Sequence, residues 1–364
     1  MPVRFGVIGL GRGRGLVRIA RAVGGIEVTA IYDIDAARAA GVAAEIGARC
    51  FDDYAAFLAS DIDVVVVASP VPNHAEHAIS ALAAGKHVLS EVTACANEAE
   101  ARSLVEAARS TTGVYMMAEN YRYLDEVELV RRLHLEGRFG ELYFAEGEYL
   151  HDCRGLWYTP QGELTWRGRG GLGVYCTHSV GPVLYITGGR VTSVSAMAVA
   201  GGRYDQRVAI PTMHLMQMDS TAGVTLRVRV DHVSPRPHQM AYYSVQGTQG
   251  SYEAPRGFGD GAKVWMDGVH EPSLFHAPAQ WHALGEHAHR VIPERLAAPK
   301  EARLGGHGTS EYWLFKEFLA VLRGEVECPI DVYRALDYTL PGIAALESAE
   351  RGGAPVPVPD PRMW

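Results

Sequence analysis

Short apolar runs alternate with amphipathic stretches along residues 1–122. The apolar runs predict strands at Arg4–Ile8, Val28–Tyr32, Val64–Ala68, His87–Ser90 and Val114–Ala118. The stretches Ala75–Ala84 and Ala96–Ala108 predict amphipathic helices between them. The run Val64–Val67 shows no alternation, as expected for a strand that is covered on both faces. Strands that alternate with helices in this way predict βαβ units and a parallel sheet.

After Glu141 the pattern changes to longer strands in which apolar and polar residues alternate. These strands are predicted at Glu141–Leu150, Val191–Ala200, His214–Met218, Val224–Asp231 and Ala241–Val245. Helical patterns return at Glu311–Leu322 and Val332–Ala349, and a proline-rich tail follows. We therefore expect an α/β chain of two domains. Residues 1–122 form the first, and residues 123–364 form an α+β domain whose final helices can pack back on the first.

Composition narrows the class of protein. A chain of 364 residues that is 48% hydrophobic can bury a large core. The net charge of -8 argues against a nucleic-acid partner, which would need clustered lysine and arginine. The five cysteines form no CxxC pair and predict reduced thiols, with neither a disulfide framework nor a zinc site. The first strand leaves no room for a signal peptide and no run is long enough to span a bilayer, so we expect a cytoplasmic protein.

A glycine-rich loop, Gly9-Leu10-Gly11-Arg12-Gly13-Arg14-Gly15, joins the first strand to a helix expected from Leu16. Glycines in such a loop let the backbone turn sharply and approach a pyrophosphate at a helix N-terminus. The third glycine of GxGxxG falls one position late, because Arg14 occupies its place. The second strand leads to Asp33, whose carboxylate suits the adenosine ribose hydroxyls and repels a 2′-phosphate. The loop and Asp33 predict a Rossmann domain that binds NAD through Gly9, Gly11, Arg12, Gly13, Arg14 and Asp33.

Two readings of this loop stay open. A glycine-rich turn without a ligand is the structural alternative to a dinucleotide site. Arg38 lies a few positions after Asp33, and an arginine there leaves NADP open as a second cofactor.

Two further segments, Ser69–His74 and Ala84–Glu91, resemble the glucose-fructose oxidoreductase/inositol dehydrogenase superfamily, called Gfo/Idh/MocA. In that superfamily a TPxxxH turn and an AGKHVxxEKP strand end flank the nicotinamide. The resemblance implies a Rossmann domain followed by a domain with an open mixed sheet. It also implies cofactor contacts from Ser69, Pro70, Asn73, His74 and Glu91. The EKP triplet reads Glu91-Val92-Thr93 here, so the lysine that such dehydrogenases use is absent.

Five ordered segments resemble glycoside hydrolase family 109 and its relatives: Met116–Asn120, Gly147–Arg154, Tyr175–Val183, Ser234–His238 and Gly305–Gly308. Those enzymes hydrolyse glycosides with NAD as a recycled catalyst. The resemblance implies Tyr175 and His178 as catalytic residues and Asn120 as a cofactor contact. It implies sugar contacts from Glu119, Tyr149, Arg167 and His238.

The chemistry implied by this resemblance explains the residue types. Oxidation of the sugar C3 to a ketone makes the C2 proton removable, so the C1 substituent can leave by elimination before water adds and the ketone is reduced. A histidine suits proton transfer near neutrality, whereas a tyrosine needs a lowered pKa to act as a base. Tyr175 and His178 share one face if their segment is helical.

Other readings remain for function and for single residues. The chain can instead be an NAD-dependent sugar dehydrogenase that releases a keto-sugar, or a dinucleotide sensor without turnover. His178 can be a structural histidine, and Tyr149 and Arg167 can serve packing. The segment Trp281–His289 offers histidine and glutamate, but a polar helix explains that spacing and we predict no metal. We expect a small-molecule glycoside as substrate and a homo-oligomer, either dimer or tetramer, because open sheets in this superfamily commonly pair.

Overall fold

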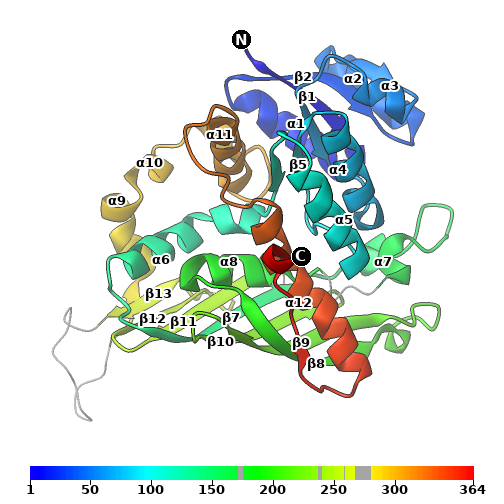
Figure 1. The fold of residues 1–364 in the computed structure, drawn as a ribbon. Helices are drawn as coiled ribbons and strands as arrows, with labels where there is room; N and C mark the ends of the chain where they lie inside the picture. Colours follow the sequence, from blue (N-terminus) through cyan, green and yellow to red (C-terminus); the bar gives the residue numbers. More distant parts are fainter. Residues whose placement is uncertain (171–174, 237–239, 258, 267–279) are drawn as a thin grey trace. The chain divides into compact units, whose positions relative to one another are not determined.

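The computed structural model describes residues 1–170, 175–236, 240–257, 259–266 and 280–364. The chain forms two compact units, and each of them is discontinuous in sequence. The first unit contains residues 1–124, 298–339 and 360–364, and the second contains residues 125–297 and 340–359. The division falls inside helix α12 (Val332–Glu350), drawn in red in Figure 1. Each unit is built around its own sheet.

The first unit contains a six-stranded parallel sheet in the order β3-β2-β1-β4-β5-β6. Its strands are β1 (Val3–Ile8), β2 (Ile26–Tyr32), β3 (Arg49–Phe51), β4 (Val64–Val67), β5 (His87–Ser90) and β6 (Tyr115–Met117). Its helices are α1 (Leu10–Ala22), α2 (Ala36–Ile46), α3 (Tyr54–Leu58), α4 (His74–Ala83), α5 (Glu98–Arg109) and α11 (Ser310–Leu322), together with the first residues of α12. This strand order is that of a Rossmann fold, which confirms the predicted class.

Burial explains the arrangement of the first sheet. All four residues of β4 are buried, as the continuous valine run predicts. Helix α1 packs against α11, while α4 packs against α5 (Figure 1). The ring of Phe5 on β1 lies 6.2 Å from that of Phe315 and 6.1 Å from that of Phe318, both on α11. A helix from the far end of the chain therefore completes the core of this unit.

The second unit contains a nine-stranded sheet in the order β14-β13-β12-β11-β7-β10-β9-β8-β15. Its strands are β7 (Leu142–Leu150), β8 (Val191–Ala200), β9 (Pro211–Ser220), β10 (Thr225–Asp231), β11 (Ala241–Gly247), β12 (Gly250–Glu253), β13 (Lys263–Met266), β14 (His282–Ala283) and β15 (Val356–Pro357). Strands β7 and β10 are parallel and the other pairs are antiparallel. The mixed sheet expected for this part of the chain is confirmed.

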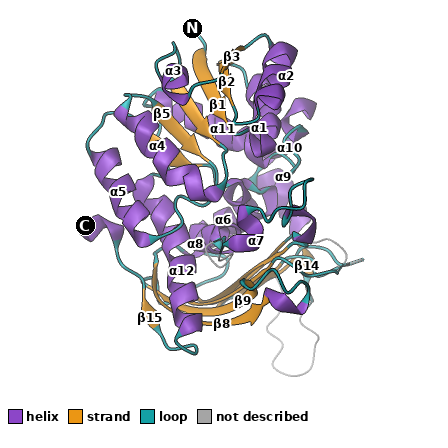
Figure 2. Ribbon diagram, turned by 90° about the vertical axis from the view of Figure 1, so that its right-hand side faces the viewer, coloured by secondary structure: helices purple, strands orange, loops and turns teal. Residues whose placement is uncertain are grey.

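Helix α8 (Thr177–Thr187) lies on this sheet against β7, β10 and β11, and helix α6 (Asp125–Leu135) packs against α8 (Figure 2). The approach of α8 depends on Gly147 of β7, where a Cβ atom would lie 2.5 Å from the carbonyl oxygen of Ser179. The unit also contains the short helices α7 (Trp166–Arg169), α9 (Ala288–Val291) and α10 (Pro293–Leu296). Side chains on α8 are thereby held close to the ends of β7 and β10.

Three local expectations need correction. Helix α1 begins at Leu10, inside the glycine loop, and not at Leu16, because Gly9 alone makes the turn. The single polar helix expected over Trp281–His289 is wrong, since this segment contains β14, a 3₁₀ helix at Leu284–His287 and the start of α9. The short strands β3, β12, β13, β14 and β15 were not predicted.

Three observations concern the part of the chain that the structure describes. No group of three or more histidine, cysteine, aspartate or glutamate side chains there is arranged to hold a metal ion. No helix in the same part of the chain is long and apolar enough to cross a membrane. All five cysteines are free thiols, and Cys95, Cys153 and Cys176 are buried.

Candidate active site

The glycine loop provides a test of whether the first unit fits a dinucleotide. Gly9 has a φ of +85°, and a Cβ atom there would lie 2.4 Å from the backbone nitrogen of Ser69. A Cβ at Gly13 would lie 2.9 Å from Cγ1 of Val7, whereas a Cβ at Gly11 would meet nothing within 4 Å. These are the three roles of a dinucleotide loop: a tight turn, an open approach for the pyrophosphate, and close packing of helix on strand. The loop fits the cofactor, with Gly13 in the packing role.

Asp33 follows β2 and is buried. Its Oδ2 accepts a hydrogen bond from the backbone nitrogen of Leu10 at 2.6 Å, and its Oδ1 accepts one from that of Asp35 at 2.8 Å. A guanidinium nitrogen of Arg38 lies 3.6 Å from Oδ2. Asp33 therefore ties the glycine loop to the end of β2 and keeps a carboxylate beside the first turn of α1. Arg14 pairs with Glu45 at 3.0 Å.

The segment after β4 is held by His74 at the start of α4. Its Nδ1 lies 2.8 Å from the carbonyl oxygen of Thr93, and its Nε2 lies 2.7 Å from that of Ser69. The 3₁₀ helix Val71–Asn73 follows Pro70, and the Asn73 nitrogen donates to the Pro70 carbonyl at 2.9 Å. His74 thus joins the segment after β4 to the segment after β5.

Glu91 follows β5 and bonds Arg12 directly, whereas Asn120 follows β6 and is linked to Arg12 through Glu311, a residue that the sequence did not single out. Arg12 Nε donates to Oε1 of Glu91 at 2.7 Å, and Arg12 Nη2 donates to Oε1 of Glu311 at 3.1 Å. Asn120 Nδ2 donates to the same Glu311 oxygen at 3.3 Å. The negative charge of Glu91 is the main influence that raises the pKa of Arg12. Glu311 is therefore a member of the site, although nothing in the local pattern marks it.

Glu119 also lies in the first unit, where it is fully buried. Its Oε1 accepts a hydrogen bond from the backbone nitrogen of Tyr121 at 3.1 Å and caps the 3₁₀ helix Asn120–Tyr123. The carboxylate is thus fixed where β6 ends.

The second unit gathers aromatic and imidazole rings from three distant segments. The Tyr149 ring, on β7, lies 5.2 Å from that of His178, on α8, and 5.8 Å from that of Tyr175. The Tyr175 and His178 rings lie 5.3 Å apart at an interplanar angle of 84°. Tyr175 precedes α8, which begins at Thr177, so the two rings meet without sharing a helix face. We call Tyr149, Tyr175, His178, His151 and His232 the ring cluster.

Two members of the ring cluster were absent from the residues selected by sequence. The Tyr149 hydroxyl oxygen lies 2.9 Å from Nδ1 of His151, and the His232 ring lies 5.8 Å from the rings of both Tyr149 and Tyr175. His151 follows β7, His232 follows β10, and the parallel pairing of these strands brings their ends together. His151 lies within the family-like segment Gly147–Arg154, whereas only this strand pairing indicates His232.

The backbone of His178 is fixed by Tyr243, whose hydroxyl donates a hydrogen bond to the His178 carbonyl oxygen at 2.5 Å. Arg167 lies in α7 with its guanidinium 4.2 Å from the ring centroid of Trp166. His238 lies outside the described residues. The only lysine in the sequence of the second unit, Lys263, pairs with Asp260 at 3.2 Å. The ring cluster therefore supplies proton-transfer groups that are tyrosine and histidine.

Comparison with known families first defines the class. Residues 3–119 match the model of the oxidoreductase family Gfo/Idh/MocA, NAD-binding Rossmann fold, and residues 127–253 match a Gfo/Idh/MocA C-terminal domain. Residues 210–362 match the glycosyl hydrolase 109 C-terminal domain. The fold and the matches define an enzyme of the Gfo/Idh/MocA class with NAD as cofactor.

Individual relatives narrow the class to one family. A glycosyl hydrolase family 109 protein of Streptomyces coelicolor is 30% identical, over 98% of this chain and 83% of its own. An α-N-acetylgalactosaminidase of Tannerella forsythia is 29% identical, over 82% of this chain and 71% of its own. The chain belongs to glycosyl hydrolase family 109.

Solved structures show the same fold at lower identity. Levoglucosan dehydrogenase in complex with NADH and levoglucosan has a TM-score of 0.79 and 23% identity, over 99% of this chain and 100% of its own. An oxidoreductase domain protein from Kribbella flavida has a TM-score of 0.82 and 21% identity, over 99% of this chain and 100% of its own. These likenesses establish the architecture of both units.

Proposed function

We propose that this protein hydrolyses a glycosidic bond by transient oxidation of the sugar C3, elimination across C1 and C2, addition of water and reduction of C3. The contact of the Tyr175 and His178 rings at 5.3 Å, in a member of family 109, is the observation that carries the proposal. The only lysine of the second unit's sequence is engaged by Asp260, which supports tyrosine and histidine as the proton-transfer groups.

Bound NAD supplies the reversible two-electron oxidation of the sugar. His178 accepts the proton of the C3 hydroxyl as C3 becomes a ketone, and it returns that proton when C3 is reduced. Tyr175 removes the C2 proton, now acidified by the ketone. The C1–O bond breaks, and the aglycone oxygen keeps the electron pair and takes a proton from solvent, so that the aglycone leaves as an alcohol. Water then adds across C1 and C2 and leaves a hydroxyl at C1. The sum of these steps is hydrolysis without net redox change.

Other residues are proposed as contacts. Gly9, Gly11, Arg12, Gly13, Arg14, Asp33, Ser69, Pro70, Asn73, His74, Glu91 and Asn120 are the proposed cofactor residues. The open space at Gly11 and the buried Asp33 carboxylate support this role for the loop. Glu119, Tyr149, Arg167 and His238 are the proposed sugar contacts. The hydrogen bond between Tyr149 and His151 supports a fixed position for the Tyr149 hydroxyl.

The decisive experiment is hydrolysis in deuterated water with nitrophenyl glycosides, beginning with the N-acetyl-α-galactosaminide. We expect the released sugar to carry deuterium at C2, because the proton removed there is replaced from solvent. The position of the label is read by nuclear magnetic resonance, and a non-enzymatic hydrolysate incubated with the protein is the control. A product without deuterium at C2 would indicate direct displacement at C1 and would contradict the proposal.

Two variants separate the proton-transfer roles. Tyr175→Phe should abolish elimination but keep some reduction of bound NAD by sugar, since C3 oxidation does not need the C2 base. His178→Ala should impair reduction of NAD as well. Tyr143→Phe, at an exposed position on β7, is the matched control and should behave like the parent. Continuous accumulation of NADH by the parent protein would support the dehydrogenase alternative instead.

We also propose a homo-oligomer, dimer or tetramer, that pairs through the larger sheet. Met197 of β8 and Leu215 of β9 are paired across the two strands, and these residues are 72% and 42% exposed to solvent. They line a cavity of about 500 Å³ together with Phe144 and Arg227. Exposed apolar pairs of this kind favour association. Light scattering should give a multiple of the chain mass, and Met197→Glu with Leu215→Glu should reduce it.

A further inference from the structure

A cluster of charged and polar side chains around the buried Glu311, in the first unit, has no place in the reaction steps. The Glu311 cluster consists of Arg12, Glu91, Asn120, His307 and Glu311. Its members come from the start of α1, the segments after β5 and β6, the turn that precedes α11 and the first turn of α11. Arg12 and Glu311 are separated by 299 positions in the sequence. Such a cluster is not produced by local structure.

Glu311 is its centre, with a side chain that is 1% exposed. Its Oε1 accepts hydrogen bonds from Arg12 at 3.1 Å and Asn120 at 3.3 Å, and lies 2.5 Å from Nδ1 of His307. Its Oε2 accepts a hydrogen bond from the Ser310 hydroxyl at 3.1 Å. Burial opposes ionisation of Glu311, but the hydrogen bond from His307 and the charges of His307 and Arg12 outweigh it and lower its pKa to about 2. Glu311 therefore carries a fixed negative charge at neutral pH.

The glycine-rich turn before α11 is shaped around this carboxylate. A Cβ atom at Gly305 would lie 2.7 Å from Oε2 of Glu311, so any other residue would displace it. Gly306 and Gly308 have φ angles of +98° and +67°, which other residues rarely adopt. The turn places the His307 ring 5.5 Å from that of Tyr121, next to Asn120. Its glycines thus serve to seat Glu311 and His307.

The cluster lies at the end of the sheet where the reactive half of the dinucleotide belongs. A Rossmann sheet binds one mononucleotide on each side of the switch point between β1 and β4. Asp33 follows β2 and marks the adenosine side, so β4, β5 and β6 form the nicotinamide side. Glu91 and Asn120 follow β5 and β6, which places the Glu311 cluster on the nicotinamide side.

When His307 is neutral, the cluster carries one more negative charge than positive charges. Glu91 and Glu311 share the single guanidinium of Arg12, and His307 adds a positive charge only when it is protonated. The nicotinamide ring is positively charged in NAD⁺ and neutral in NADH. An excess of negative charge near the ring stabilises the oxidised form relative to the reduced form.

We propose that Glu311 is a positioning residue that holds Arg12 between two carboxylates on the nicotinamide side, so that the protein binds NAD⁺ more tightly than NADH. This preference would favour the return of electrons to the sugar within each cycle. The inference rests on NAD binding by the first unit and not on the glycosidase steps, so it is tested by binding alone.

The test compares the dissociation constants of NAD⁺ and NADH for Glu311→Gln, Glu311→Asp and the parent by calorimetry. The measurements are all made at pH 8.5, above the pKa of about 6.5 of a free imidazole. In Glu311→Gln the preference for NAD⁺ should fall about tenfold, equal to a rise of about 30 mV in the midpoint potential of the bound couple. Glu311→Asp keeps the charge and should keep most of the preference. Glu317→Gln is the matched control on α11, because Glu317 bonds Tyr123 outside the cluster, and it should behave like the parent.

Arg12→Gln is a second test, independent of Glu311→Gln, because loss of the guanidinium should raise the preference for NAD⁺ over NADH. An equal loss of affinity for both forms in Glu311→Gln would show a purely structural role and overturn the proposal. If Glu311→Gln fails to fold, as judged by circular dichroism, the test depends on Arg12→Gln. A ratio of NADH to NAD⁺ dissociation constants in Arg12→Gln that equals the parent's would also overturn the proposal.

Discussion

The glycines of the dinucleotide loop have different structural roles. Gly9 makes a turn with a positive φ, Gly11 leaves open space, and Gly13 allows α1 to approach β1 and the segment after β4. In the GxGxxG spacing, Arg14 occupies the position of the third glycine, which allows the helix to pack closely on the strand. In the structure Gly13 has that role, one position earlier than the motif requires.

This assignment predicts a contrast between two neighbouring glycines. Gly9→Ala should lower the free energy of unfolding by about 2 kcal/mol or more and weaken NAD binding, because its Cβ would meet the backbone of Ser69 at 2.4 Å. Gly15→Ala lies within α1, where its Cβ would meet only Arg12 at 3.6 Å, and it should raise stability by about 0.5 kcal/mol. Urea unfolding and calorimetry measure both effects. Equal losses in the two variants would contradict the assigned roles.

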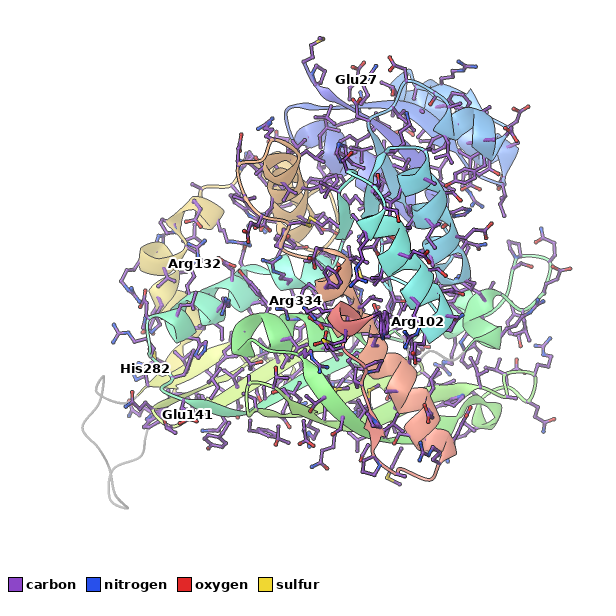
Figure 3. The ribbon with its side chains drawn as sticks, viewed as in Figure 1. Glu27, Arg102, Arg132, Glu141, His282 and Arg334 are labelled. Atoms are coloured by element: carbon purple, nitrogen blue, oxygen red, sulfur yellow. The ribbon has the colours of Figure 1, made fainter. Side chains whose placement is uncertain are left out.

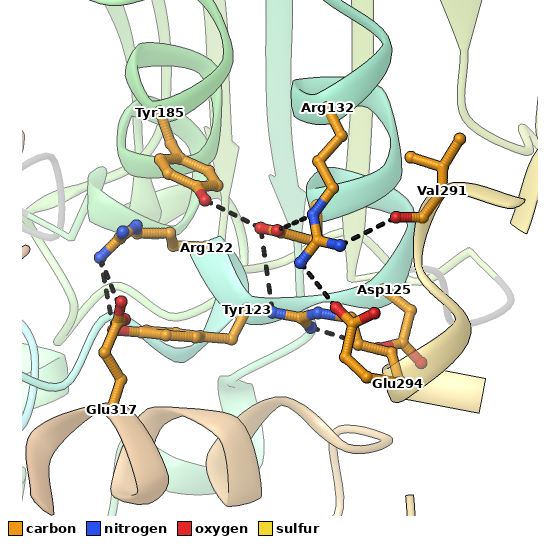
Figure 4. Close-up of polar contacts among 10 residues, drawn as sticks. Arg122, Tyr123, Asp125, Arg132, Tyr185, Val291, Glu294 and Glu317 are labelled. Atoms are coloured by element: carbon orange, nitrogen blue, oxygen red, sulfur yellow. Dashed lines mark hydrogen bonds and ion pairs between the residues drawn. The ribbon is translucent and has the colours of Figure 1, made fainter. Parts of the chain in front are cut away.

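Elements of the second unit are joined by a charge network around the buried Glu128. Figure 4 shows Arg132 of α6 bonded to the carbonyl oxygen of Val291 at 2.8 Å and to Glu294 at 2.6 Å. Glu128 of α6 accepts hydrogen bonds from Arg132 at 2.6 Å and from the hydroxyl of Tyr185, on α8, at 2.8 Å. Arg295 of α10 lies 3.8 Å from the same carboxylate. The network fixes α6 and α8, and therefore supports the helix that carries His178.

The network predicts a pH-dependent contribution to stability. Burial raises the pKa of Glu128, but Arg295, Tyr185 and Arg132 outweigh it and lower the pKa below its usual 4.5. A carboxyl whose pKa is depressed by folding stabilises the protein above its unfolded pKa and loses that contribution as pH falls through the folded value. Glu128→Gln should therefore lower the free energy of unfolding by about 1–3 kcal/mol at pH 7 and by less at pH 3. Urea titrations at the two pH values measure the difference.

The matched control for this variant is Glu98→Gln on α5. Glu98 pairs with Arg102 at 2.7 Å, but both side chains are about half exposed, and Arg102 is labelled in Figure 3. Exposed pairs contribute under about 1 kcal/mol, so this variant should change little at either pH. A Glu128→Gln effect no larger than that of Glu98→Gln would mean that the network is not stabilising.

In the whole molecule, each unit is built from segments that are separate in the sequence. Residues 298–339 and 360–364 belong to the same unit as residues 1–124. The Met117 nitrogen on β6 donates to the carbonyl oxygen of Ile330 at 3.0 Å. The buried Asp337 accepts two hydrogen bonds from Arg362, at 3.0 and 2.8 Å. The dinucleotide-binding unit therefore requires the last part of the chain for its core and for the Glu311 cluster.

This organisation predicts that residues 1–124 do not form a stable domain alone. Without α11 the ring of Phe5 loses its partners Phe315 and Phe318, and the apolar side of α1 is exposed. The fragment should bind a hydrophobic dye, unfold without a cooperative transition and bind NAD at least tenfold more weakly than the full chain. In the full chain, Phe318→Ala should cost about 3–5 kcal/mol. Cooperative unfolding of the fragment with full NAD affinity would contradict this prediction.

The sequence by itself determined the local elements and the types of residue at their ends. Strands β5 and β8 have the bounds that the pattern predicted, because runs of buried or alternating side chains report directly which backbone faces are covered. The glycine loop and Asp33 indicated NAD, and the resemblance to family 109 indicated a tyrosine–histidine pair. The strands β3, β12, β13, β14 and β15 were missed because two to four residues are too few to show a period, whereas the equally short β5 lies in a segment that resembles a known family.

Tertiary structure alone decided which distant segments meet. The parallel pairing of β7 with β10 brings His151 and His232 to Tyr149, and the packing of α11 brings Glu311 to Arg12. Periodicity encodes which side chains are buried, because burial depends on the local path of the backbone. It does not encode the partner, because register and helix packing are set by the fit of side chains from segments that lie far apart in the sequence.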